Sequence, residues 1–323
     1  MRAAVVTPEG VAVRDVAVPV PGPSQVLVKV RASGLNRADL IVASGRPHGP
    51  IGGAGTVLGL EWSGEIAEVG ADVKGLAVGD RVMCAGSGGY AEYAVCDWGR
   101  CFKIPANNMT FPQAATLPVG LSTMHNAIVT AGRLAKGENI VIQGASTGVG
   151  ILGLQIAKAM GAGKVIGTST TPARRARLQD FGADMALDSR DPKWADAVLE
   201  ATGGKGADLI VDQISGYVAN DNLKATRVLG RIVNVGRLGG FKGEFDFDLH
   251  AARRIDYIGV TFRTRSVDEV REIGRLMRAD LWGDIEAGKL KLPIDKTFPL
   301  DQAPAALAHM RANAHFGKIV LVT

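Results

Sequence analysis

The chain has 323 residues, which is more than a single hydrophobic core usually supports, so we expect two domains. Hydrophobic residues make up 46% and charged residues 21%, and no apolar stretch reaches the length of about 20 residues that spans a bilayer. Lys and Arg exceed Asp and Glu by 37 − 32 = 5 without long blocks of like charge, a balance that suits a small anionic ligand better than nucleic acid.

The three cysteines show no CxxC spacing and therefore indicate neither a disulfide framework nor a structural zinc site. The first ten residues, MRAAVVTPEG, are typical of a strand and a turn and lack the apolar core of a signal peptide. We expect a cytoplasmic protein that binds no membrane.

Up to about Pro118 the sequence alternates short β-rich runs with glycine and proline turns, which predicts an irregular, mostly antiparallel β domain. From Asn139 short apolar strands alternate with helices, including one predicted over 171–184. This pattern indicates a parallel sheet covered on both faces, between about Gly120 and Val260. The tail returns to a strand, a helix starting near Asp301 and a closing strand, so we expect it to fold back onto the first domain.

The stretch IQGASTGVGILG carries a GxGxxG pattern formed by Gly148, Gly150 and Gly153. A predicted strand precedes it, a helix begins within it, and a second strand follows. Such glycines allow a tight turn and let a pyrophosphate approach the N–H groups at the helix start. A glycine-rich turn without a ligand is the alternative, but the strand–helix–strand context favours a dinucleotide site. The predicted contacts come from Ala145, Ser146, Thr147, Gly148, Val149 and Gly150.

The choice of cofactor should be decided at the end of the second predicted strand, where NAD enzymes place an acid on the ribose 2′-hydroxyl. The segment GTSTTPARR has no acid there, and the hydroxyls of 168–171 precede Arg174. Hydroxyl donors beside a guanidinium suit a 2′-phosphate, so the sequence predicts NADPH, with contacts from Ser169, Thr170 and Arg174. Arg175 and Arg177 are interpreted as a solvated helix face.

Nine short motifs follow one another along nearly the whole chain: GLNRADL (34–40), LGLEWSGEIAEVG (58–70), VGDRV (78–82), GGYAEYAV (88–95), QAATLPVGLST (113–123), GASTGVG (144–150), FGAD (181–184), TGGKGADLIVD (202–212) and GKIVL (317–321). In this order and spacing they resemble the zinc-independent medium-chain dehydrogenases/reductases of the quinone oxidoreductase, zeta-crystallin-like group. The resemblance implies an α/β fold in which a Rossmann NADP-binding domain, 120–260, is inserted in a GroES-like, mainly β catalytic domain, 1–119 and 261–323. It also implies a cofactor in the cleft between these domains.

The zinc-dependent relatives have Cys where this chain has Asn36, and Gly-His-Glu where it has Gly59, Leu60 and Glu61. Their third ligand has no Cys, His or Asp counterpart in QAATLPVG. Zinc needs three or four N, S or O ligands, so no metal site is expected.

The resemblance also assigns cofactor contacts. Ser122 matches a hydroxyl residue near the nicotinamide, and the segments VGRLGG (235–240) and FRTR (262–265) align with cofactor-contacting loops. Related reductases often carry Asn-Tyr where this chain has Asp188 and Ser189, so one aromatic contact to the adenosine phosphate is expected to be missing. The further predicted contacts are Ser122, Val235, Gly236, Arg237 and Phe262.

Without a metal, quinones and activated C=C bonds are the favoured hydride acceptors, because the product anion is delocalised. Asn36 matches a position beside the nicotinamide and substrate and is the candidate donor to the developing oxyanion; alternatively it only satisfies local backbone. Arg263 is a second candidate, with a surface or interface salt bridge as its alternative. His48, in the loop 45–55, is either a proton donor or a solvated loop histidine.

Glu61 stands in an apolar strand-like run, VLGLEWSG. Burial disfavours a charged carboxylate unless the group is paired, so we interpret Glu61 as a structural group beneath the active site. Its partner is not predicted by the sequence.

The first functional hypothesis is an NADPH-dependent reductase that transfers hydride to quinones or α,β-unsaturated carbonyls. The alternatives are an enoyl-thioester (acyl-CoA) reductase and, from another class, a low-turnover NADPH-binding redox sensor, an RNA-binding relative or a crystallin-like structural protein. In similar proteins the last Rossmann strand, here IDYIGV (255–260), pairs with its copy in a second chain, so we predict a homodimer.

Overall fold

The computed structural model describes all residues, Met1–Thr323. The chain divides into two compact units. Unit 1 comprises Met1–Val119 and Phe262–Thr323, and unit 2 comprises Gly120–Thr261. The predicted division, 1–119 with 261–323 and 120–260, differs from these bounds only in the assignment of residue 261.

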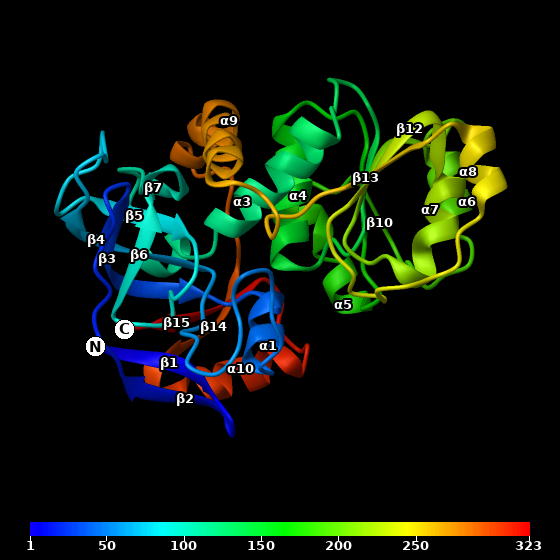
Figure 1. Cartoon of the computed structure of the whole chain (residues 1–323). Coiled ribbons are helices and arrows are strands. Elements are labelled where there is room, and N and C mark those ends of the chain that lie inside the picture. The colour runs from blue at the N-terminus through cyan, green and yellow to red at the C-terminus, as the bar shows by residue number, and fades with distance from the viewer. The chain divides into compact units, whose positions relative to one another are not determined.

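Unit 1 contains mostly short strands (Figure 1). Its strands are β1 (Arg2–Thr7), β2 (Gly10–Asp15), β3 (Gln25–Gly34), β4 (Glu61–Val69), β5 (Arg81–Ala85), β6 (Tyr93–Asp97), β7 (Cys101–Lys103), β14 (Ile294–Pro299) and β15 (Lys318–Val322). Its helices are α1 (Arg37–Ala43), η1 (Trp98–Arg100), α2 (Phe111–Ala114), α9 (Val267–Glu286), η5 (Leu300–Gln302) and α10 (Ala303–Arg311), and α3 (Pro118–His125) begins at its border.

The main sheet of unit 1 has seven strands in the order β14-β15-β3-β4-β5-β7, with β6 also paired to β3. All these pairs are antiparallel except β14 with β15. The closing strand β15 lies against β3, with Gly34 opposite Val320. The C-terminal tail therefore completes the sheet that the first third of the chain begins, as the sequence predicted.

Several hydrophobic cores stabilise unit 1, and two of them are large. One lies within the sheet and contains buried side chains of β3, β4 and β5, with Trp62 fully buried at its centre. The other packs α10 against β1, α1 and β15, and includes Tyr90, whose side chain is also fully buried. Val26, Val28 and Val30 alternate along β3 and all belong to the first of these cores, as expected for residues on one face of a strand.

Unit 2 alternates strands and helices (Figure 1). Its strands are β8 (Ile140–Ile142), β9 (Val165–Thr168), β10 (Met185–Leu187), β11 (Ala207–Asp212), β12 (Thr226–Asn234) and β13 (Asp256–Gly259). Its helices are η2 (Asn126–Ala131), α4 (Gly148–Ala159), α5 (Pro172–Arg175), η3 (Leu178–Phe181), α6 (Trp194–Ala201), η4 (Gly216–Val218), α7 (Ala219–Ala225) and α8 (Phe247–Arg253).

All six strands of unit 2 run parallel, in the order β10-β9-β8-β11-β12-β13. Helices α6, α7 and α8 cover one face, where Val141, Ile166, Ile210 and Ile232 form a buried cluster with Trp194. Helix α4 packs on the other face against β8 and β9. The strand order and directions confirm the expected α/β fold, with a Rossmann-like parallel sheet in unit 2 and a mainly β unit 1.

Two helices differ from the sequence prediction. The helix expected over 171–184 is divided into α5 and the 3₁₀ turn η3, which ends at Gly182 in the left-handed region with a φ of 98°. Helix α9 was not predicted, although Ser266 and Glu269 form a capping box at its start. None of the helices combines the length and the apolar composition that crossing a bilayer requires.

Candidate functional site

The phosphate loop follows β8 and leads into α4. Thr147 caps this helix, and its hydroxyl accepts a hydrogen bond from the N–H of Gly150 at 2.9 Å. A Cβ atom added at Gly150 would stand 2.6 Å from the carbonyl oxygen of Gly144, so only glycine fits this close turn. The cap takes one of the helix's unpaired N–H groups, and the first turn retains others for an anion. These residues fit a dinucleotide pyrophosphate.

Side chains from two neighbouring strands fix the loop. Gln213, directly after β11, donates to the carbonyl oxygen of Gln143 at 3.0 Å and accepts from the hydroxyl of Thr147 at 3.1 Å. Ser169, directly after β9, donates from its hydroxyl to that of Ser146 at 3.0 Å. The predicted residues Ser146, Thr147 and Ser169 are therefore brought together at the carboxyl end of the sheet.

One hydroxyl of the segment 168–171 is not available to a ligand. The side chain of Thr168 is fully buried; it donates to Gln143 at 2.7 Å and accepts from the N–H of Gly144 at 3.0 Å. The segment therefore offers the exposed hydroxyls of Thr170 and Thr171, whereas Ser169 is buried and its hydroxyl donates to Ser146.

The arginines after β9 differ in their surroundings. Arg174 is half-buried in α5, as is Arg175. Arg175, interpreted above as part of a solvated face, instead donates to the carbonyl oxygen of Ser169 at 2.7 Å and to Asp188 at 3.0 Å. That interpretation was wrong for Arg175, because the acid that binds it follows β10 and lies beside β9 only in the folded sheet.

An aromatic side chain stands beside Ser189 despite the missing tyrosine. The hydroxyls of Ser189 and Tyr217 are 3.1 Å apart, and the guanidinium of Arg190 lies 4.0 Å from the ring centroid of Tyr217. Tyr217 belongs to η4, which follows β11, so its approach to Ser189 was not visible in the sequence.

The remaining predicted cofactor contacts lie in three places. Val235, Gly236 and Arg237 follow β12, where the N–H groups of Val235 and Gly236 donate to the carbonyl oxygen of Asp212. Ser122 is buried in α3. Phe262 is half-buried at the start of the second segment of unit 1.

In unit 1 the side chain of Asn36 belongs to a buried polar network. Its Nδ2 donates to Oε1 of Glu61 at 3.1 Å and makes a longer contact of 3.4 Å with the carbonyl oxygen of Gly34. Its Oδ1 accepts from Nζ of Lys318 at 2.8 Å. Lys318 also forms an ion pair with Glu61, and the N–H of Val119 donates to Oε2 of Glu61 at 2.9 Å.

This network decides which way the amide of Asn36 faces. An ammonium only donates and an ionised carboxylate only accepts, so Lys318 must face the oxygen of Asn36 and Glu61 its nitrogen. The local backbone is satisfied by other atoms: the carbonyl oxygen of Asn36 accepts from Asp39 N at 2.9 Å, and Asn36 N donates to Asp39 Oδ2 at 2.7 Å.

Asp39 and Tyr90 form a second buried pair next to this network. The hydroxyl of Tyr90 donates to Oδ2 of Asp39 at 2.6 Å, whereas Oδ1 of Asp39 has no partner. Burial raises the pKa of Asp39 to about 7, against the opposing effects of the Tyr90 hydroxyl and the Asn36 N–H. Burial, followed by the charge of Asp39, also raises the pKa of Tyr90 well above its usual value.

Arg263 and the loop of His48 lie together in unit 1. Gly49 has a φ of 66°, and a Cβ added there would stand 3.2 Å from Cβ of Arg263. His48 is half-buried and its N–H donates to the carbonyl oxygen of Ile51 at 2.7 Å. Arg263 is exposed.

The side chains at the positions that match the zinc ligands of the zinc-dependent relatives do not fit a metal. Glu61 is held by Lys318 and Asn36, and the chain contains no group of three or more His, Cys, Asp or Glu side chains that could hold a metal ion. Three or four such ligands would be needed for zinc.

Two family profiles match the chain. Residues 22–106 match the alcohol dehydrogenase GroES-like domain, and residues 148–278 match a profile described as zinc-binding dehydrogenase. The second profile is named for zinc binding, but this chain lacks the side chains that would hold the metal.

The chain is similar to complete enzymes and to part of a much larger one. It is 30% identical over 320 residues to a quinone oxidoreductase of Rattus norvegicus, covering 95% of this chain and 92% of that protein. It is 29% identical to a mycocerosic acid synthase-like polyketide synthase of Mycobacterium tuberculosis, of which it spans 14%. A mycobacterial structure complexed with NADPH has a TM-score of 0.88, with 26% identity and 100% of each chain covered.

Proposed function

Since the chain belongs to the quinone oxidoreductase group of the medium-chain dehydrogenases/reductases, we propose that it transfers hydride from NADPH to quinones or α,β-unsaturated carbonyl compounds without a metal. The observation that carries this proposal is the capped glycine loop after β8, which fits a pyrophosphate. The surroundings of Glu61 lack the further side-chain ligands that zinc needs.

The preference for NADPH is supported by the segment after β9. No acid occurs between Gly167 and Arg175, while Thr170 and Arg174 offer hydroxyl and guanidinium donors. A phosphate oxygen is well suited to these donors, and a ribose hydroxyl lacks the charge that a guanidinium recognises. The structural relative complexed with NADPH agrees with this choice.

Bound NADPH supplies the hydride, and the protein must orient the acceptor and stabilise the charge that develops on its oxygen. We assign the second task to Asn36, with Arg263 as an additional cation near the loop of His48. Lys318 and Glu61 turn the nitrogen of Asn36 in a fixed direction, so it is already oriented before an acceptor binds.

An enoyl-thioester reductase is the second candidate, because the chain is also similar to a segment of a mycocerosic acid synthase-like polyketide synthase. The chemistry is closely related, since hydride addition to an enone and to an enoyl thioester both generate an enolate. A redox sensor would share the cofactor site but would turn over slowly.

Steady-state oxidation of NADPH, followed by its near-ultraviolet absorbance, separates these candidates. The assay uses a quinone panel, an enone panel and a crotonyl thioester. Turnover that is fastest on quinones or enones supports the proposal, and turnover confined to the thioester establishes the second candidate. Tight NADPH binding without turnover on all three would contradict both.

A further inference from the structure

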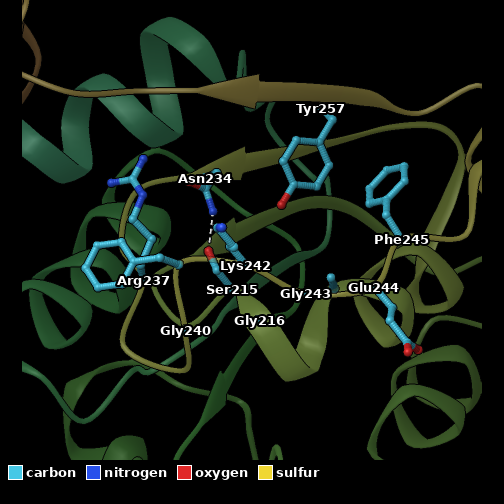
Figure 2. Close-up of a pocket in the computed structure, with 12 residues that line it drawn as sticks. Ser215, Gly216, Asn234, Arg237, Gly240, Lys242, Gly243, Glu244, Phe245 and Tyr257 are labelled. Atoms are coloured by element: carbon cyan, nitrogen blue, oxygen red, sulfur yellow. Dashed lines mark hydrogen bonds between the residues drawn. The ribbon is translucent and has the colours of Figure 1, made fainter.

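Unit 2 contains a pocket of about 220 Å³ beside the carboxyl end of β12 and the edge strand β13 (Figure 2). None of its lining residues belongs to the phosphate loop, 144–150, or to the segment 168–177. In sheets of this kind a dinucleotide binds where the strand order reverses, which is between β8 and β11 in this chain. The pocket lies on the other side of β11 and shares only Arg237 with the predicted cofactor contacts.

Two cations line this pocket. The ammonium of Lys242 makes no ion pair. The guanidinium of Arg237 has only a 3.5 Å contact with the carbonyl oxygen of Val235. Burial raises the pKa of Asp212, and the positive charge of Arg237 opposes this shift. The one acid of the lining is Glu244, whose carboxylate points away from the other labelled side chains in Figure 2. The pocket therefore carries a net positive charge.

Aromatic rings form a second part of the lining. Phe245 and Tyr257 meet edge to face with centroids 5.6 Å apart, and the ring of Phe241 is 79% exposed. The hydroxyl of Tyr257 points toward Ser215 and Lys242 in Figure 2. Burial raises the pKa of Tyr257, so this hydroxyl keeps its proton at neutral pH and can donate it in a hydrogen bond.

The floor of the pocket is held rigidly. Ser215 has a φ of 58° and a ψ of −157°, a conformation that residues with a side chain rarely adopt. Its N–H donates to Asp212 at 2.9 Å, and its hydroxyl donates to the carbonyl oxygen of Gly236 at 2.8 Å. Asn234 donates to the same hydroxyl. The polar groups of the floor are thus fixed before any ligand arrives.

We propose that this pocket binds a nucleoside phosphate in addition to the dinucleotide cofactor. Lys242 contacts the phosphate, because its ammonium makes no ion pair and can form a charge-assisted hydrogen bond with a phosphate oxygen. Phe241 and Phe245 pack against the base, since aromatic rings stack favourably with one another. The volume is too small for a whole dinucleotide. This site is independent of the proposed hydride transfer.

Calorimetric titration of adenosine monophosphate into the full chain tests the proposal, with saturating NADPH present to fill the dinucleotide site. We expect binding that weakens at least tenfold in Lys242→Ala and is retained in Lys242→Arg. Lys205→Ala, an exposed lysine of the same unit, serves as the matched control and should bind as the parent chain does. Inorganic phosphate should bind at least tenfold more weakly than adenosine monophosphate.

Three results would overturn the proposal: no binding in the presence of NADPH, equal binding by Lys242→Ala, or an equal loss of NADPH affinity in that variant. The last would show that the pocket is part of the dinucleotide site. Failure of the proposed reductase activity is read separately, from NADPH turnover. Binding of adenosine monophosphate that depends on Lys242 in a chain without turnover would leave the pocket assigned and the reductase rejected.

Discussion

Lys318 and Glu61 form an ion pair in the interior of unit 1, where their side chains are 4% and 0% exposed. Each charge has further partners: Lys318 donates to the carbonyl oxygen of Leu35 at 3.1 Å, and Glu61 accepts from the N–H of Val119. The pair joins the first residue of β15 to the first residue of β4 at the C-terminal end of β3, which lies between these two strands. It therefore links the C-terminal tail to the strand that carries Glu61.

Removing one member of this pair should destabilise the protein strongly. Lys318→Met leaves a buried carboxylate without its cation, which costs about 3–5 kcal/mol in comparable cases. The double variant Lys318→Met with Glu61→Gln removes both charges and should recover much of that loss. Urea unfolding of the parent, both single variants and the double variant measures the coupling. Additive losses in the double variant would show that the two charges do not stabilise each other.

Asp39 should make the stability of unit 1 depend on pH. Its pKa is about 7 in the folded chain, above the unfolded value of 3.8, so the folded state binds the extra proton. The contribution of this group to the free energy of unfolding is present at low pH and is lost as the pH rises through 7. Between pH 6 and 8 the free energy of unfolding falls by about 1.4 kcal/mol because of this group. Asp39→Asn, which cannot ionise, should remove this component.

Urea unfolding at several pH values checks the Asp39 prediction. The free energy of unfolding of the parent should fall relative to that of Asp39→Asn between pH 6 and 8. A constant difference between the two proteins across that range would contradict the raised pKa.

The sequence indicated the local parts of the fold better than the long-range contacts. The strand, glycine loop and helix around Gly148 are contiguous, so their periodicity and turn residues were sufficient. Glu61 and Lys318 are 257 residues apart, and nothing in the local pattern of either one points to the other. Asp188 and Arg175 are only 13 residues apart, but their pairing depends on the adjacency of β9 and β10.

For α9 and for Asn36 the sequence held part of the information that a prediction needed. The capping box at Ser266 and Glu269 was visible in the sequence and could have predicted the start of this helix. Asn36 was identified by its motif, whereas the orientation of its amide follows from Lys318, which enters from the closing strand. Its role in catalysis stays a prediction.

Replacing Arg174 should affect NADPH and NADH differently. If Arg174 binds the 2′-phosphate, Arg174→Ala loses a charge-assisted hydrogen bond worth about 1.5–3 kcal/mol. The KM for NADPH should then rise about tenfold or more, while the KM for NADH stays within about twofold. Arg177→Ala, an exposed arginine after the same helix, is the control. Equal effects of Arg174→Ala on both cofactors would refute the assignment.

Asp188 should oppose NADPH binding through its pairing with Arg175. The side chain of Arg175 is 25% exposed and that of Asp188 is 29% exposed. Arg175 also contacts the carbonyl oxygen of Ser169, a predicted 2′-phosphate residue. Asp188→Asn removes a negative charge there and frees the guanidinium. Ion pairs this exposed are worth up to about 1 kcal/mol, so the KM for NADPH should fall about two- to fivefold. An unchanged ratio of the NADPH and NADH constants would show that Arg175 does not reach the phosphate.

The edge strand β13 is expected to pair with its copy in a second chain. It hydrogen-bonds only to β12 within unit 2, and the side chain of Tyr257 on it is 39% exposed. The N–H of Val260 donates inward, to the carbonyl oxygen of Asn234. Because successive N–H groups of a strand alternate in direction, the N–H of Gly259 points outward.

Gly259→Pro removes that outward donor while leaving the hydrogen bonds to β12, and a Cβ at Gly259 meets no atom within 4 Å. Light scattering at micromolar concentration should show a dimer of the 33.8 kDa chain and of Gly259→Ala, and a monomer of Gly259→Pro. A monomeric parent chain, or a dimer that persists in Gly259→Pro, would rule out pairing through this strand.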